Sequence, residues 1–175
     1  MAKKRKAKSS GAKFVPFVLL VLAIAVICTG FLAGVTLAIE NMDPQSYTLF
    51  EVTFGKELAG GAIGGLASGK TTIDFSILAM LGLFLPIVGA LLSLLIRNKI
   101  GGLLAFLLFV GSAVLLFLVP QFTSISVTAE LLGNTTTTTK TFAELEWGLG
   151  IGSIIGGAVS CLGALVSLLQ IAKGR

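Results

Sequence analysis

Residues 147–172 read WGLGIGSIIGGAVSCLGALVSLLQIA, an apolar run without a charged residue. A helix needs about 20 mostly apolar residues to cross the roughly 30 Å hydrocarbon core of a bilayer. The run is long enough, and its many glycines, alanines and serines allow helices to approach closely in lipid, where dispersion contacts replace the hydrophobic drive. This stretch therefore predicts a membrane-spanning helix with closely packed neighbours.

Three further segments of this kind precede it, at 14–39, 75–96 and 100–119, and none contains Asp, Glu, Lys, Arg or His. Of the 175 residues, 55% are hydrophobic and 12% are charged. The charged share is about half that of a soluble globular protein, which argues against a soluble enzyme, and the hydrophobic share excludes a disordered chain. We predict an all-α membrane protein, a four-helix transmembrane bundle over residues 14–172.

The charges are divided between alternate connections of these segments. Residues 1–13, 97–99 and 173–175 carry basic residues and no acid, whereas 40–74 and 120–146 carry all eight acids. Lys and Arg near the ends of spans stay in the cytoplasm. The pattern predicts a multi-pass protein of the cell membrane with cytoplasmic tails at 1–13 and 173–175 and two outer loops. The residues expected to set this topology, and to contact the bilayer's anionic headgroups, are Lys3, Lys4, Arg5, Lys6, Lys8, Lys13, Arg97 and Lys99.

An alternative interpretation makes 14–39 a cleaved secretory signal, with Thr36-Leu37-Ala38 as the cleavage triplet. Signal peptides have apolar cores of only 7–15 residues. The longer run here favours a retained span.

Both outer loops contain stretches in which apolar and polar residues alternate, the period of a half-buried strand. Tyr47–Phe54 alternates in the first loop and residues 124–131 in the second, where Gly133-Asn134 forms a turn signal before the β-branched run Thr135–Thr139. We expect a small extracytoplasmic antiparallel β cap of two or three strands. Asn134 also begins a glycosylation sequon, which we interpret as a turn residue before a Thr-rich strand.

Residues Gly64–Thr71 match the phosphate-binding pattern G-x-x-x-x-G-K-[ST]. That chemistry requires a buried strand before the loop and an α/β domain around it, and a short outer loop offers neither. We interpret the match as part of a Gly-rich flexible or short-helical segment.

The chain offers little for catalysis. It has no His, and no ionisable residue lies in the four apolar segments, where proton relays and ion sites need one. Cys28 and Cys161 are interpreted as small hydrophobic residues in helix contacts. We therefore predict no catalytic residue, no metal site and no cofactor.

Small residues recur every four positions in the last segment and once in the first, a spacing that brings helices into close contact. The residues predicted to pack helices are Gly30, Gly34, Gly148, Gly152, Gly156, Gly157, Ser160 and Ala164. We expect the first and last segments to pack together through them. The alternative is a homo- or hetero-oligomer joined through the last segment. Pro86 should kink the second segment because it removes an intrahelical hydrogen bond, and Trp147 should lie at headgroup level.

The topology resembles the four-span plan of the claudins, with inner termini and a longer first outer loop. The Trp and paired Cys of the claudin first loop are missing, so no residue role follows from the resemblance. We expect a non-enzymatic structural, adhesion or accessory subunit of a membrane assembly, without nucleic-acid binding. The alternative is a channel or transporter subunit that acts only as an oligomer.

Overall fold

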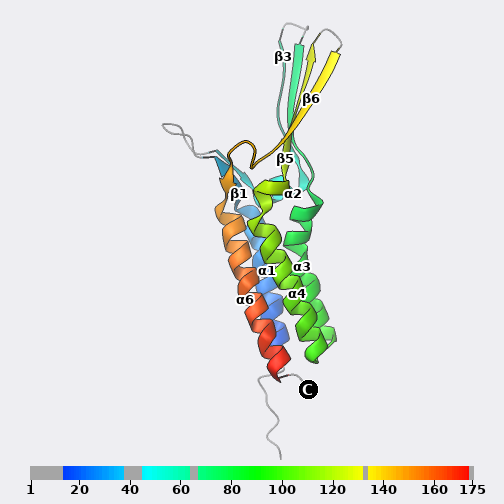
Figure 1. Cartoon of the computed structure of the whole chain (residues 1–175), viewed down its shortest axis with the longest axis vertical. Helices are drawn as coiled ribbons and strands as arrows, with labels where there is room; N and C mark the ends of the chain where they lie inside the picture. The colour runs from blue at the N-terminus through cyan, green and yellow to red at the C-terminus, as the bar shows by residue number, and fades with distance from the viewer. Residues whose placement is uncertain (1–13, 38–44, 64–66, 132–133, 174–175) are drawn as a thin grey trace, which may run out of the picture.

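The computed structural model describes residues 14–37, 45–63, 67–131 and 134–173, and it is mostly helical with two small antiparallel sheets (Figure 1). The helices are α1 (Val15–Cys28), the 3-10 turn η2 (Thr29–Phe31), α2 (Leu49–Phe54), α3 (Ile77–Leu95), α4 (Lys99–Phe117), α5 (Val119–Phe122) and α6 (Ile151–Lys173). The strands are β1 (Ala33–Leu37), β2 (Gln45–Thr48), β3 (Lys56–Ile63), β4 (Ala67–Ile73), β5 (Ser124–Leu131), β6 (Asn134–Thr141) and β7 (Gly148–Leu149).

Three helices among the described residues, α3, α4 and α6, are long and apolar enough to cross a membrane. They lie within two residues of the predicted segments at most ends, but α6 begins at Ile151 instead of Trp147. The connection between α3 and α4 is too short for anything except an antiparallel pair, and Asn98 caps α4 by accepting a hydrogen bond from the Gly101 N–H at 3.1 Å.

The prediction of one helix over 14–39 is wrong beyond Cys28, and residues 38–39 lie outside the described residues. The α-helix stops at Cys28, one 3-10 turn follows, and Ala33–Leu37 is a strand. Thr29 donates its hydroxyl to the Val26 carbonyl at 2.6 Å. Beyond that point β1 has partners on both sides, β2 and β7, so strand pairing satisfies backbone groups that a longer helix would have bonded internally.

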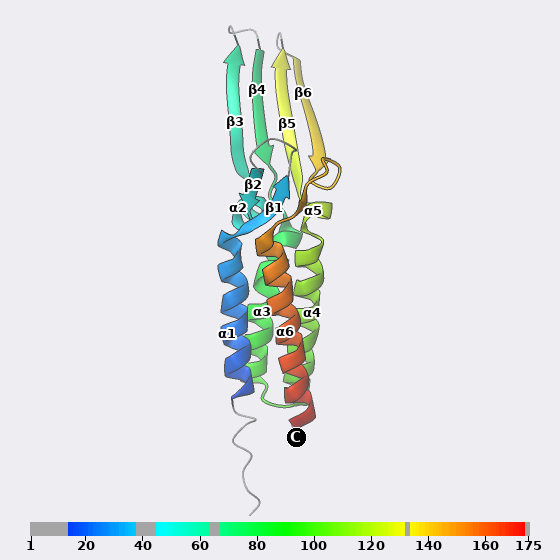
Figure 2. The ribbon, with the colours of Figure 1, turned by 90° about the vertical axis from the view of Figure 1, so that its left-hand side faces the viewer.

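The four apolar helices form a ring in which α1 and α4 each contact both α3 and α6 (Figure 2). Leu19, Ala23 and Phe109 are fully buried between them in one core cluster. A second cluster lies where the helices meet the sheets and contains Val35, Phe142 and their neighbours.

The β structure is larger than the expected two or three strands. One sheet has the order β2-β1-β7 and the other the order β3-β4-β5-β6. The strands of the four-stranded sheet run along the long axis of the bundle and project beyond its end (Figures 1 and 2). The β5–β6 hairpin confirms the alternation seen in the second loop, with Ser124 paired to Thr141 and Leu131 to Asn134.

Two predictions in the first loop are wrong. Tyr47–Phe54 is not one strand, because Leu49–Phe54 is a helix that starts with a capping box: the Glu51 N–H donates to Thr48 Oγ1 at 3.2 Å and the Thr48 N–H to Glu51 Oε2 at 2.9 Å. Of the segment Gly64–Thr71, expected to be flexible or short-helical, residues 67–71 belong to strand β4, which pairs with β3 (Gly61 with Gly69), and residues 64–66 lie outside the described residues.

Candidate functional site

Close helix contacts lie along the small-residue face of α6. A Cβ atom added at Gly152 would lie 2.8 Å from the Thr29 carbonyl oxygen, and one at Gly156 would lie 2.7 Å from the Thr29 hydroxyl. Such short distances leave no room for a side chain. The N-terminal half of α6 therefore approaches η2, the 3-10 turn after α1, at backbone distance.

The other predicted packing residues meet different neighbours. Gly157 receives the ring of Phe117 from α4, and Gly30 and Gly34 face Phe50 and Leu49 of α2 instead of α6. Gly148 lies in β7, where the nearest atom to an added Cβ is 3.8 Å away. The small residues of α6 thus contact two different neighbours, η2 and α4. Gly30 and Gly34 of the first segment contact α2, near the base of the sheets.

One backbone group still joins the first and last segments. The Gly34 carbonyl accepts hydrogen bonds from the Gly150 N–H at 2.9 Å and from Ser153 Oγ at 2.8 Å. Gly150 directly precedes α6 and Ser153 lies in its first turn, so this carbonyl joins β1 to the start of α6.

A chain of hydroxyls crosses the bundle at the level of Pro86. Because proline has no N–H, the Gly82 carbonyl four residues earlier lacks its helical donor. Ser112 of α4 donates its hydroxyl to that carbonyl at 2.6 Å, and Ser160 Oγ of α6 lies 3.0 Å from Ser112 Oγ. Each hydroxyl has one proton, so Ser160 is the donor to Ser112. The three helices are joined by groups that are fully buried.

A second buried polar pair lies near the opposite end of the bundle. Ser93 of α3 donates to Gln170 Oε1 of α6 at 2.5 Å. Among the described residues, every buried side-chain nitrogen or oxygen has a hydrogen-bond partner. The polar side chains inside the bundle bond either to a neighbouring helix, as Ser93 and Ser112 do, or to their own helix, as Ser167 does.

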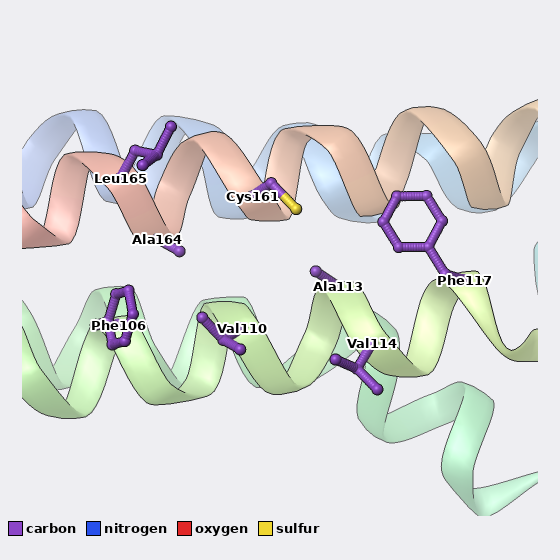
Figure 3. Close-up of a pocket in the computed structure, with 8 residues that line it drawn as sticks. All are labelled: Phe106, Val110, Ala113, Val114, Phe117, Cys161, Ala164 and Leu165. Atoms are coloured by element: carbon purple, nitrogen blue, oxygen red, sulfur yellow. The ribbon is translucent and has the colours of Figure 1, made fainter.

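An apolar groove of about 400 Å³ lies between α4 and α6 and is lined by residues of both helices. Figure 3 shows Cys161 of α6 opposite Ala113 of α4, with Phe117 and Phe106 toward the two ends. Ala164, predicted as a packing residue, also lines the groove. Cys161 and Cys28 are both exposed on helix surfaces, whereas they were expected to be small hydrophobic residues in helix contacts.

The structure describes two of the eight basic residues that were predicted to set the topology. Arg97 and Lys99 lie at the turn between α3 and α4, at the end of the bundle where α1 begins and α6 ends (Figure 2). The other predicted topology residues, Lys3, Lys4, Arg5, Lys6, Lys8 and Lys13, lie outside the described residues.

Aromatic rings fill the junction between the helices and the sheets. Trp147 stacks on Tyr47 with ring centroids 5.1 Å apart and meets Phe142 edge-on at 5.3 Å. Trp147 is only 9% exposed, so its indole is a core group of the junction between helices and sheets.

Hydrogen bonds also fix the helix α2 beside this junction. Lys56 Nζ contacts Glu51 Oε1 at 2.5 Å. The bond from Lys56, followed by the bond from the Thr48 N–H, lowers the pKa of Glu51 below its ordinary value. The motif Thr48-x-x-Glu51 was visible in the sequence as a capping-box signal.

The projecting sheet has two different faces. On one, Ser126 Oγ lies 2.8 Å from Thr139 Oγ1, and Thr128 Oγ1 lies 3.2 Å from Thr137 Oγ1. The alternation of side chains puts Val127 on the other face, and it is 47% exposed. The sheet thus displays one hydroxyl-rich face and one weakly apolar face.

The phosphate-binding pattern has no matching geometry. Residues 64–66 lie outside the described residues, and Gly69, Lys70 and Thr71 belong to β4, which is paired on both sides. Lys70 forms an ion pair with Glu57. In the described ranges, no group of three His, Cys, Asp or Glu residues is arranged to hold a metal ion.

No protein-family model, curated protein or solved structure matches the chain. The similarity to claudins is therefore confined to the topology inferred from the sequence.

Proposed function

We propose that the chain is a multi-pass protein of the cell membrane that serves as a non-enzymatic structural, adhesion or accessory subunit. In this proposal α1, α3, α4 and α6 cross the bilayer as a four-helix bundle, and the two sheets form an extracytoplasmic cap. The observation that carries the role is the four-stranded sheet, whose strands project beyond the end of the bundle (Figure 2) and whose edge strand β6 has exposed side chains at residues 135–140.

The helix surfaces support the proposed membrane position. Large apolar side chains point outward on all four helices, among them Phe17 on α1, Leu91 on α3, Leu107 on α4 and Leu165 on α6. Contiguous apolar surface of this extent is unfavourable in water and favourable against lipid.

The first helix is the shortest of the four proposed spans. Its apolar helical part runs over Val15–Phe31. At 1.5 Å per residue for α1 and 2.0 Å for the 3-10 turn, it is about 27 Å long. This is close to the roughly 30 Å of the hydrocarbon core, so α1 and η2 together suffice for a fourth span.

The charges support one orientation. Arg97 and Lys99 lie at one end of the bundle, whereas acidic residues such as Glu51, Asp74 and Glu144 lie toward the sheets. Because Lys and Arg next to spans are retained in the cytoplasm, the sheet end faces outward and both termini face inward. The basic residues at the inner end also suit contact with anionic headgroups.

The interior of the bundle favours a supporting role over a passage for solutes. The hydroxyls of Ser112 and Ser160 are occupied by contacts between helices, and Phe109 fills the space beside Gly163. A pore through this chain alone would have no polar lining. An oligomeric channel or transporter subunit is the alternative that a flux measurement addresses.

Two measurements test the proposal. In a background with Cys28 and Cys161 replaced by Ala, a membrane-impermeant maleimide applied to intact cells should label Thr137→Cys and should label Arg97→Cys only after permeabilisation. Labelling of Arg97→Cys from outside would contradict the orientation. Solute flux from liposomes containing the purified protein would favour the channel alternative, whereas photo-crosslinks from the sheet to neighbouring proteins in native membranes would support the subunit role.

A further inference from the structure

The outer edge of β6 has hydrogen-bonding groups in a defined pattern. In an antiparallel pair, alternate residues turn their N–H and C=O groups toward the partner strand or away from it. The Phe142 N–H donates to the Thr123 carbonyl at 3.0 Å, so even-numbered residues face β5. The Thr141 N–H points away and donates to Glu144 Oε2 at 2.9 Å.

The same alternation turns the backbone groups of Thr135, Thr137 and Thr139 away from β5. In the described part of the chain no strand pairs with that side of β6. Glu144 occupies only the last outward N–H, nearest the bundle. Three successive outward residues are thus left as a template for another strand.

This edge lacks the features that usually prevent pairing, which are proline, bulges and several charges. Its register with β5 is unbroken over all eight pairs, it has no proline, and its one charged residue is Lys140 at the bundle end. The opposite edge is different, because β3 has a bulge between Glu57 and Ala59. The β-branched threonines of β6 also favour extended structure.

We propose that β6 pairs antiparallel with β6 of a second copy of this chain. The two-fold axis passes between the two Thr137 residues, and each Thr135 pairs with Thr139 of the other copy. Each of these three pairs exchanges two N–H···O=C hydrogen bonds, and two four-stranded sheets become one. The register follows from Glu144, because its bond to the Thr141 N–H leaves only Thr135, Thr137 and Thr139 available. Thr137 is the middle residue of these three and therefore lies at the two-fold axis.

Charge and surface favour the antiparallel arrangement over a parallel one. The antiparallel two-fold axis is perpendicular to the sheet, so the weakly apolar face around Val127 continues across the pair. Lys140 then lies opposite Asn134 of the second copy, so the two Lys140 residues are at opposite ends of the paired strands. A two-fold axis along the strands would put both Lys140 residues at the same height and would join the apolar face of one copy to the polar face of the other.

The direction of the strands determines what the pair connects. The strands run along the bundle axis (Figure 2), so a two-fold axis across them sets the two bundles at opposite ends of the joined sheet. This step rests on the proposed function: with the helices in a bilayer and the sheet outside, the two copies lie in facing membranes. Each contact is small, and many copies on two surfaces add their strengths through multivalency.

A disulfide between two vesicle populations tests the pairing and its register. One population carries Thr136→Cys and the other Thr138→Cys, both in the background with Cys28 and Cys161 replaced by Ala. These positions face each other in the proposed pair at a non-hydrogen-bonded site, where Cα atoms lie about 4.5 Å apart, within the range of a disulfide. Mild oxidation of the mixture should give a disulfide-linked dimer that contains one chain from each population.

Two populations that both carry Thr136→Cys are the matched control. In the proposed register those cysteines are diagonal neighbours about 7–8 Å apart, too far for a disulfide. Equal linkage in the control and in the mixture, or linkage only within one vesicle, would overturn the proposal. An impermeant maleimide on the same Thr136→Cys vesicles separates the two proposals: labelling from outside without linkage refutes the pairing alone, and absence of labelling refutes the orientation.

A charge exchange at the two-fold axis gives a second readout. Thr137→Lys and Thr137→Glu each put like charges opposite one another, so vesicles with either variant should stay dispersed. Mixing the two populations should restore aggregation to the level of the wild-type protein. Dispersed wild-type vesicles would contradict the pairing and would favour an edge strand from a different protein. Aggregation of every variant to the same extent would contradict a contact at Thr137.

Discussion

The hydroxyl of Ser112 should stabilise the bundle because Pro86 removes the helical donor to the Gly82 carbonyl. In Ser112→Ala that carbonyl is left unpaired in a buried site, and the proton of Ser160 loses its acceptor. An unsatisfied buried group costs about 1–3 kcal/mol, while hydrogen bonds between membrane helices average about 0.6 kcal/mol and reach about 1.7. We therefore expect Ser112→Ala to lower the free energy of unfolding by about 1–2 kcal/mol.

The role of Pro86 is tested by a double-mutant cycle. In a Pro86→Ala background, the N–H of residue 86 can donate to the Gly82 carbonyl, so Ser112→Ala should then cost only about 0.5 kcal/mol. The difference between the backgrounds is a coupling energy of about 1 kcal/mol. Ser167→Ala is the matched control, because the Ser167 hydroxyl bonds only to its own helix at the Gly163 carbonyl.

Unfolding can be followed in detergent micelles with the fluorescence of Trp147, the only tryptophan of the chain. Its stacking on Tyr47 reports the junction between helices and sheets. An equal loss of stability from Ser112→Ala in the wild-type and Pro86→Ala backgrounds would refute the argument that this serine replaces the missing proline N–H.

Two further predictions concern packing and pH. Gly152→Leu should lower the melting temperature and disturb the bundle, because the added atoms meet the Thr29 carbonyl at 2.8 Å; Gly148→Ala, with its nearest neighbour at 3.8 Å, should leave melting unchanged. The bond from Lys56 holds the pKa of Glu51 below its ordinary value, so this contribution to stability is fully present above the unfolded pKa of about 4.3 and is lost as the pH falls through the folded value. In thermal melts, Glu51→Gln should reduce the loss of stability below about pH 4, and an unchanged pH profile would refute this role of Glu51.

Local sequence patterns correctly predicted the elements in which one composition or one alternation extends over the whole length. The long uncharged runs of α3, α4 and α6 and the alternation of β5 each follow from their own composition and periodicity. The division of charges also agrees with the two ends of the bundle, because Arg97 and Lys99 belong to the connection between α3 and α4, which lies at the end away from the projecting sheet (Figure 2).

The misassigned elements depend on partners far along the chain. Residues 33–37 are apolar enough for a helix and become a strand because β2 and β7 pair with them. The hairpin of β3 and β4 has weak strand propensity in its glycines, and it gains order from pairing with β5. Leu49–Phe54 alternates like a strand, yet its capping box and the contact of Leu49 with Gly34 favour a helix.

Composition alone was enough to predict long apolar helices between a basic end and an acidic one, because helix length, apolar character and charge position are properties of local segments. Three features could be seen only in the folded chain: the neighbours that the glycines of α6 contact, the hydroxyl that donates to the Gly82 carbonyl, and the edge of the sheet that no described strand covers. These depend on how helices rotate about their axes and how strands align, and both are set by contacts between residues distant in the chain.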